Sequence, residues 1–420
     1  MEKNFIQCAA AMAVAMALAS CGGKGELDQP TDKVFVEAAI PGTGATTNFS
    51  FDLGIVVNGK YYFTDRNNKA VDVIDLGTFA VTQITGSGAN AFTGCKPNAS
   101  CAGANNGLSG PDGINAIPGT TLLFVGDVDF VRVVDTSTNS VLSSIRVGTT
   151  GFRADEGCVD TEHNLYMISS PDAPVPFASF ISLTTQALLS TVLFTDPAGG
   201  SGAVAGGLEQ CRYDPTTKSF IVNNDGTVAN PHGEVNVIPA SSITALAPGA
   251  TVAAFSLAGV KRFPLGNCDP TGLDLGPGTD MIVECRPGDA GSALTTLIMD
   301  RTNGNILKTL PVGGGDQVAY DARTNRYFVA ASRWHASGVN ELGGGCSATN
   351  LCTPVLAVIN ATTRNIALIV PTGNNAHSVA VDPSSGLVFV PHSSAAAPAG
   401  CATCVANGFT NGGVSIFDMP

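Results

Sequence analysis

The sequence predicts an all-β fold, a seven-bladed β-propeller, and three observations lead to this prediction. A phrase made of an alternating apolar segment, a short turn and a second alternating segment recurs seven times, at the period of a few tens of residues that is typical of repeat architectures. Most copies are followed by two further strand-like segments, which together supply the four strands of a propeller blade. The 49 glycines and the abundant Val, Ile, Thr and Phe favour short strands joined by tight turns.

Each copy of the phrase begins at a polar residue. The seven first residues are Asp52, Asp112, Glu156 (or its neighbour Asp155), Glu209, Asp269, Asp316 and His377. The seventh copy is followed only by VSIFDM, a third strand, so a fourth strand is missing from the last blade. The segment KVFVEAAIPG, which starts at Lys33, is expected to supply it, because pairing the two ends of a ring removes an open sheet edge. Residues 33–420 are therefore predicted to form the propeller, with the N-terminal strand closing the last blade.

The first residues of the chain predict export. Residues 1–20 have the pattern of a lipoprotein signal peptide, since Phe5 to Ala19 form an apolar segment too short to span a membrane. This segment runs into the sequence LASC, which ends at Cys21 and resembles the lipobox of bacterial lipoproteins. The resemblance implies a lipid on Cys21. Ordinary secretion, with cleavage near Ser20, is the alternative.

A lipid on Cys21 would place the protein in the cell envelope. Residues 21–32 are expected to be a flexible tether, and Gly22 after the cysteine is compatible with sorting to the outer membrane, on its periplasmic or surface side. The formal net charge of −13, with scattered Lys and Arg, excludes a nucleic-acid partner and leaves the lipid anchor as the expected membrane contact. We expect a monomer.

The cysteines agree with an oxidising compartment, because ten of the 12 remain after Cys8 in the signal peptide and Cys21 are set aside. Spacing and the predicted hairpins suggest four bridges: Cys95–Cys101, Cys268–Cys285, Cys346–Cys352 and Cys401–Cys404. Cys158 and Cys211 occupy equivalent positions in adjacent repeats, either linked or as buried thiols. Zinc is the rival explanation for the pair Cys401 and Cys404, although no second such pair exists.

The repeat phrase, seen best as VAVDPSSGLVFV from Val379 to Val390, resembles that of the YVTN-type propellers. This family comprises seven-bladed secreted bacterial proteins related to the propeller of nitrous oxide reductase. The resemblance extends from Lys33 to Met419 and implies the fold. It implies no single function, because the family includes binding proteins, scaffolds and a few enzymes.

Four long insertions are predicted to lie on one face of the ring, where the first strands begin and the second strands end. They are residues 85–111, 223–234, 332–354 and 393–413. Insertions gathered on one side of a repeat protein usually mark its binding face, although neutral drift in loop length is the alternative. The sequence Arg333-Trp334-His335 lies at the start of the 332–354 insertion, where it either contacts a ligand or anchors its loop through Trp334.

The seven first residues of the repeats would bring six acidic groups and one imidazole to one mouth of the central channel. Turn lengths predict three directly opposed pairs: Asp52 with Asp65, Asp112 with Asp127, and His377 with His392. Opposed like charges destabilise a sheet, so shared protons, water, an inserted Lys or Arg, or a cation must separate them. An oxygen-lined ring suits Ca²⁺, whereas His377 and His392 beside Asp316 or Asp52 would suit a transition metal. A polar, water-filled channel without function is the third explanation.

The function expected from these features is a lipid-anchored binding module for a protein or glycan ligand; the sequence establishes no cofactor, and Ca²⁺ or another divalent metal is the candidate. The alternative is a metal-dependent hydrolase or lactonase, similar to the propellers of the gluconolactonase family, with Glu156, Glu209 or Asp269 holding Ca²⁺ or another divalent ion. A copper-binding oxidoreductase is a third hypothesis. The chain has only five histidines, which is fewer than copper clusters like that of nitrous oxide reductase use. The sequence contains neither a phosphate-binding loop nor a nucleophile elbow.

Overall fold

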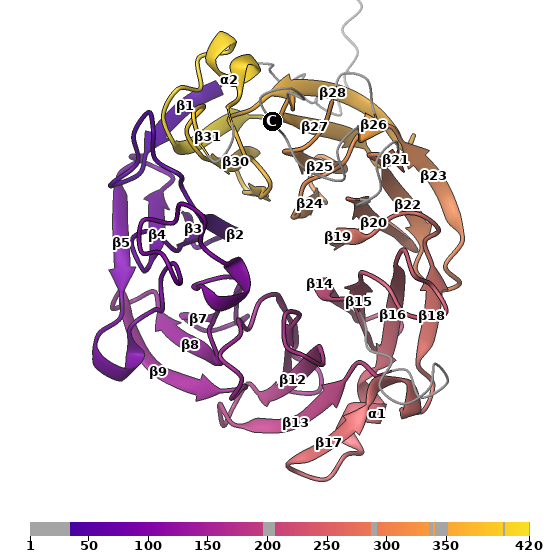
Figure 1. Cartoon of the computed structure of the whole chain (residues 1–420). Coiled ribbons are helices and arrows are strands. Elements are labelled where there is room, and N and C mark those ends of the chain that lie inside the picture. The colour runs from indigo at the N-terminus through magenta and orange to yellow at the C-terminus, as the bar shows by residue number, and fades with distance from the viewer. Residues whose placement is uncertain are drawn as a thin grey trace, which may run out of the picture.

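A computed structural model describes residues 34–195, 206–286, 292–335, 339–340, 352–397 and 400–419. Seven sheets are arranged radially around a central axis, which confirms the predicted seven-bladed propeller (Figure 1). The predicted signal peptide, Cys21 and the tether lie outside the described residues. Within the described ranges, no helix has the length and apolar character needed to cross a membrane.

Each blade places its first strand next to the axis and its last strand at the rim. The first blade comprises β2 (Phe51–Val57), β3 (Lys60–Asp65), β4 (Ala70–Asp75) and β5 (Val81–Thr85). The second comprises β6 (Ile114–Ala116), β7 (Leu122–Asp127), β8 (Phe130–Asp135) and β9 (Ser140–Arg146). The third comprises β10 (Gly157–Asp160), β11 (Leu165–Ser170), β12 (Phe177–Ser182), β13 (Leu188–Leu193) and β17 (Ala250–Ala253). The fourth comprises β14 (Leu208–Asp214), β15 (Ser219–Asn224), β16 (Glu234–Pro239) and β18 (Lys261–Pro264).

The remaining three blades follow the same order. The fifth comprises β19 (Pro270–Leu275), β20 (Asp280–Cys285), β22 (Thr296–Asp300) and β23 (Ile306–Leu310). The sixth comprises β24 (Val318–Asp321), β25 (Arg326–Ala331), β27 (Val355–Asn360) and β28 (Asn365–Pro371). The seventh comprises β29 (Ala380–Val381), β30 (Leu387–His392), β31 (Gly413–Asp418) and β1 (Val34–Ala39).

The few remaining elements are short. Within the described ranges they are β21 (Ser292–Ala293) paired with β26 (Val339–Asn340), the helices α1 (Ala240–Thr244) and α2 (Ala402–Ala406), and three 3₁₀ turns at Gly88–Asn90, Asn106–Leu108 and Ala254–Ser256. The fifth strand of the third blade, β17, follows α1 in a connection from the fourth blade and pairs in parallel with β13. The repeat phrase contains no signal for this exchange, because β17 lies outside it.

The ring closes as the sequence predicts. Strand β1 pairs antiparallel with β31, with Ala38 opposite Val414, and the two ends of the chain therefore share one blade (Figure 1). The carboxylate of Glu37 on β1 reinforces this pairing, because Ser415 donates to it at 2.8 Å and His392 Nε2 lies 2.7 Å from it. The closing strand buries the sheet edge that β31 would otherwise expose.

Apolar side chains from neighbouring blades fill the space between them. Phe180 of the third blade meets Phe220 of the fourth edge to face, with ring centroids 5.3 Å apart. Tyr61 of the first blade stacks on Phe389 of the seventh at 4.7 Å, so packing continues across the point of closure. All four rings are fully buried, and burying one such side chain contributes about 1.5–3 kcal/mol.

Three of the predicted disulfides are confirmed: Cys95–Cys101, Cys268–Cys285 and Cys401–Cys404. The undecided pair, Cys158 and Cys211, is also bonded and joins β10 to β14, the innermost strands of the third and fourth blades. Cys346 lies outside the described residues, so its bond to Cys352 stays a prediction. The bond between Cys401 and Cys404 replaces the zinc site considered for that pair.

Candidate functional site

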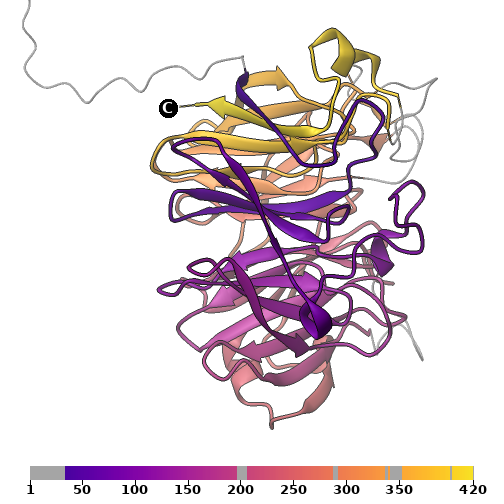
Figure 2. The ribbon, with the colours of Figure 1, turned by 90° about the vertical axis from the view of Figure 1, so that its left-hand side faces the viewer.

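Long loops gather on one face of the propeller, the loop-bearing face. Figure 2 shows α2 and several long loops projecting from the same side of the ring. Hydrogen bonds join these loops to one another: Asn48 donates to the carbonyl of Cys101 at 2.7 Å, and Thr403 donates to the carbonyl of Cys352 at 3.1 Å. Large parts of the 332–354 insertion lie outside the described residues.

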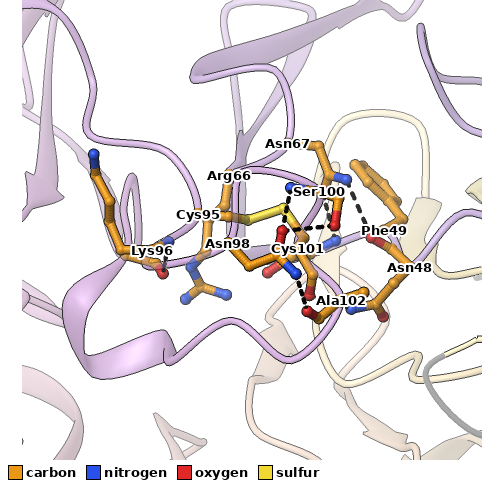
Figure 3. The surroundings of a disulfide bond; sticks show 12 residues. Asn48, Phe49, Arg66, Asn67, Cys95, Lys96, Asn98, Ser100, Cys101 and Ala102 are labelled. Atoms are coloured by element: carbon orange, nitrogen blue, oxygen red, sulfur yellow. Dashed lines mark hydrogen bonds between the residues drawn. A yellow bond between two sulfur atoms is a disulfide. The ribbon is translucent and has the colours of Figure 1, made fainter.

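A cavity of about 320 Å³ opens at the channel mouth on this face, and we call it the mouth cavity. Its charged lining comprises Arg66, Arg286, Arg333, Asp316 and His377. The cavity also contacts Cys101, in the loop that links the first and second blades. Figure 3 shows how this loop, closed by the Cys95–Cys101 disulfide, lies beside Arg66 and Asn48.

Carboxylates cluster near the starts of the innermost strands, and one of them, Asp316, also lines the mouth cavity. Three groups of side chains have ligand atoms within 4.8 Å of one another: Asp52, Asp112 and Asp155; Glu156, Glu209 and Asp316; and Asp52, Asp316 and His377. Glycines beside these acids allow the innermost strands to crowd the axis. A Cβ on Gly113 would lie 2.0 Å from the carbonyl oxygen of Asp155, and one on Gly315 would lie 1.9 Å from that of Ala330.

Arginines neutralise the first of these groups, which we call the arginine-paired cluster (Asp52, Asp112 and Asp155). Arg66 Nη2 lies 2.8 Å from Asp52, and Arg66 Nε donates to Asp112 at 2.9 Å. Arg153 Nη2 lies 2.9 Å from Asp155. Burial raises the pKa of Asp112 to about 8, although the charge of Arg66 opposes the shift. This cluster thus carries its own counter-charges.

The second group lacks such partners, and we call it the waist cluster (Glu156, Glu209 and Asp316). No described residue donates a hydrogen bond to these three side chains, and the nearest ion-pair partner is Arg286, with Nη2 4.0 Å from Glu209. Glu156 is 2% exposed and Glu209 is 7% exposed. Burial raises the pKa of Glu156 well above its usual value, and the charge of Asp316 raises it further.

His377 lies beside both clusters but forms a single-imidazole site. Its Nδ1 lies 2.7 Å from the carbonyl oxygen of Asn375, its Nε2 lies 4.0 Å from Asp52, and its ring stacks on Phe51 at 4.5 Å. Burial lowers the pKa of His377, which favours the neutral ring. The predicted pairing with His392 is wrong, because His392 turns to Glu37 on the closing strand.

One of the other two predicted pairs, Asp52 with Asp65, is also wrong. Phe51, rather than Asp52, lies opposite Asp65, because a bulge between Phe51 and Gly54 shifts the register. Asp127 binds Arg132 at 2.8 Å, whereas Asp112 binds Arg66, so their carboxylates have different partners.

Asp269 takes no part in the three groups found among the described residues, and its backbone has a positive φ of 46°. It follows the bonded Cys268, and its carbonyl accepts the amide of Arg286 at 3.1 Å. The predicted ring of seven first residues is therefore incomplete at the fifth blade.

The three residues of the Arg333-Trp334-His335 motif separate in the structure. Arg333 lines the mouth cavity and forms no ion pair with a described carboxylate, and burial together with nearby Arg286 lowers its pKa to about 9. Trp334 instead packs against the core of the sixth blade and donates to the carbonyl of Pro311 at 3.1 Å. His335 is buried, with Nε2 3.9 Å from the sulfur of Cys352. Two of the three side chains thus anchor the loop.

Sequence reasoning named Arg333 as a possible ligand contact but missed Arg66 at the channel mouth. Arg66 and Arg286 directly follow the second strands of their blades, and Arg333 follows two positions after the second strand of the sixth. A basic residue at this position in three repeats was the available signal. The repeat phrase leaves Asp155 and Glu156 as alternative first residues of the third copy, but both take part in the acidic groups, in different clusters.

No protein-family model matches the chain, and no curated protein matches it in sequence. Solved structures do resemble it. A chain of Kuenenia stuttgartiensis hydrazine synthase has a TM-score of 0.57 at 13% identity, covering 84% of this chain and 95% of that chain. The RRP9 WD40 repeats have a TM-score of 0.57 at 11% identity, covering 94% of this chain and 100% of that chain. A chain of the mitotic checkpoint complex has a TM-score of 0.55 at 9% identity, covering 100% of this chain and 98% of that chain.

These similarities define the class of protein as a β-propeller and show the fold alone. Identities of this size carry neither an activity nor a ligand from those proteins to this chain. The YVTN-type family and the lipobox therefore stay predictions from the sequence.

Proposed function

We propose that this chain is a lipid-anchored binding module of the cell envelope, which holds a protein or glycan ligand on its loop-bearing face. The observation that carries the proposal is that long loops and the mouth cavity lie on the same face of a rigid ring. Disulfides at Cys95–Cys101 and Cys401–Cys404 constrain two of these loops, so less conformational entropy is lost on binding.

The mouth cavity suits one polar group of a larger ligand. Its volume of about 320 Å³ is at the low end for small-molecule pockets, and its lining is rich in charged side chains. The guanidinium of Arg333, which lines the cavity, forms no ion pair with a described carboxylate, so its N–H groups can donate to a ligand. A side chain or a single sugar unit would enter the cavity, while the surrounding loops contact the rest of the ligand.

Binding is tested by screening the mature chain against glycan arrays and solubilised envelope proteins. Arg333→Ala in the mouth cavity is expected to lower the affinity for any captured ligand at least about tenfold, because the variant loses one well-placed polar contact. Lys218→Ala is the matched control, because its exposed ion pair with Glu162 lies at a hairpin turn on the opposite face. A ligand that tolerates Arg333→Ala but not Lys218→Ala would overturn the assignment of the face.

The anchor is tested separately. Cys21→Ala is expected to release the protein from the detergent phase of a Triton X-114 partition, because the variant lacks the lipidated thiol. Retention of the variant in the detergent phase would refute lipidation at Cys21.

A metal-dependent hydrolase or lactonase is the second candidate, and the carboxylates clustered near the starts of the innermost strands favour it. A divalent ion held there would polarise a substrate carbonyl or activate water. Calcium-dependent turnover of a lactone or ester panel by the wild-type chain, lost in Glu209→Gln, is the expected result for an enzyme. Equal background rates for both proteins would remove this candidate.

A further inference from the structure

We propose that the waist cluster of Glu156, Glu209 and Asp316 binds one hard divalent cation, Ca²⁺. The inference does not depend on which ligand the loop-bearing face holds, because it concerns only these three carboxylates, of which Asp316 lines the mouth cavity and Glu156 and Glu209 do not. It also differs from the expectation of a ring of seven ligands, because it selects three side chains and excludes the arginine-paired cluster.

The geometry fits a single ion. Ligand oxygens of the three side chains lie within 4.8 Å of one another. Two oxygens on opposite sides of a Ca²⁺ ion, each at about 2.3–2.6 Å, are about 5 Å apart, so one ion reaches all three. The ligands come from the third, fourth and sixth blades, and Ca²⁺ tolerates such irregular arrangements better than Mg²⁺ does.

The charge balance distinguishes the waist cluster from its neighbour. Arg66 and Arg153 are in direct contact with the arginine-paired cluster, whereas the closest arginine contact to the waist cluster among the described residues is Arg286 Nη2, 4.0 Å from Glu209. Three carboxylates without a guanidinium in hydrogen-bonding contact repel one another in a site of low dielectric constant. A divalent cation would remove most of that repulsion.

Unsatisfied oxygens are an independent sign of a missing partner. Glu156 Oε2 and Asp316 Oδ1 are buried and accept no hydrogen bond from the described residues; Asp112 Oδ2 and Asp155 Oδ1 share this property, but the other oxygen of each of those two residues contacts an arginine. Glu284 adds a third such oxygen nearby, since its Oε1 accepts the amide of Gly315 at 2.7 Å while its Oε2 has no donor. Buried acceptors normally have partners, and a coordinated ion satisfies several of them at once.

The cluster is also accessible to an ion and to water. Asp316 lines the mouth cavity, and Glu156 lines a second channel cavity of about 340 Å³ that contains Gln210 and Gln317. An ion can therefore enter from the channel, and water can complete the six to eight oxygens that Ca²⁺ requires.

Calcium titration of the mature chain by isothermal calorimetry tests the proposal. Binding of one Ca²⁺ per chain is expected for the wild type. Glu209→Gln and Glu156→Gln should each weaken Ca²⁺ affinity at least about tenfold, because mutating even the residues that orient metal ligands typically lowers metal affinity 10–100-fold. Asp112→Asn is the matched control, because it replaces an equally buried carboxylate in the arginine-paired cluster. It should change the Ca²⁺ affinity less than about threefold. Circular dichroism verifies that each variant is folded.

Thermal unfolding of the wild type keeps the test decisive if a variant fails to fold. Added CaCl₂ is expected to raise its melting temperature relative to excess chelator, because a ligand that binds the folded state stabilises it. Three results would each overturn the proposal: no Ca²⁺ binding by the folded wild type, equal loss in Asp112→Asn and Glu209→Gln, or Zn²⁺ binding that requires His377 in place of Ca²⁺ binding.

Discussion

Arg66 Nε donates to Asp112 Oδ1 at 2.9 Å, and this bond joins the first blade to the second at the channel mouth. Arg66 also contacts Asp52 and the carbonyl of Phe51 within its own blade. Both partners of the ion pair are buried. We therefore assign the Arg66–Asp112 ion pair a structural role, in which it connects two neighbouring blades.

Loss of Arg66 should therefore destabilise the ring. We expect Arg66→Ala to lower the free energy of unfolding by about 3–5 kcal/mol at neutral pH, because the buried carboxylate of Asp52 would lose its ion-pair partner and Asp112 would lose its hydrogen-bond donor. Urea unfolding measures the change. Lys218→Ala, which removes an exposed ion pair, should cost at most about 1 kcal/mol, and equal losses in the two variants would contradict a structural role for Arg66.

The Cys158–Cys211 bond should be the most stabilising of the four observed disulfides, since it closes the longest loop, with a sequence separation of 53. Replacing both cysteines with serine is expected to reduce stability by about 4 kcal/mol, as estimated from the entropy of loop closure. Replacing Cys401 and Cys404, whose separation is 3, should cost less. Urea titrations of both double variants decide the order, and a larger loss at Cys401 and Cys404 would refute it.

Removal of the closing strand should open the ring. A chain shortened to begin at Pro41 loses β1 and its five residue pairs with β31, and its stability should fall by about 2–5 kcal/mol. The exposed edge of β31 should also promote association, which light scattering detects. A chain that begins at Lys33 retains β1 and serves as the control. Equal melting temperatures for the two chains would show that β1 is dispensable.

Asp65 and Asp72 form a buried acidic pair in the first blade, and they predict a pH dependence. Burial raises the pKa of both carboxyls, and the charge of Asp65 raises that of Asp72 further. Because the folded-state pKa values lie above the unfolded values of about 4, this pair stabilises the fold most at acidic pH. The contribution is lost as the pH rises from about 4 through the folded-state values.

Asp72→Asn tests this dependence, because an amide resembles the protonated acid and still accepts the hydrogen bond from Gln83. We expect the variant to be about 1–3 kcal/mol more stable than the wild type at pH 7.5 and to match it at pH 4. Urea unfolding across this range measures the difference. A difference that is constant with pH would mean that the pair does not titrate as described.

The sequence was sufficient for features that depend on local pattern. Alternating strands and turns such as Asn58-Gly59 repeat in every blade, and this regularity allowed the blade count and the closing strand near residue 35 to be predicted. The disulfides within single loops or hairpins followed from spacing for the same reason.

Features that depend on contact between distant blades could not be predicted. The bulge that displaces Asp52 lies where Gly54 exchanges hydrogen bonds with Gln317 across the channel, 263 residues away in sequence. His392 is drawn to Glu37, 355 residues away, so its predicted partner His377 is left with Asp52. Only the assembled ring determines which carboxylates receive an arginine.

The proposal that three blades jointly coordinate a metal ion is tested most directly by anomalous X-ray diffraction from crystals grown in CaCl₂. We predict one calcium peak between the side chains of Glu156, Glu209 and Asp316, about 2.3–2.6 Å from their oxygens. Featureless anomalous density at that point, or a peak beside Asp112 instead, would contradict it.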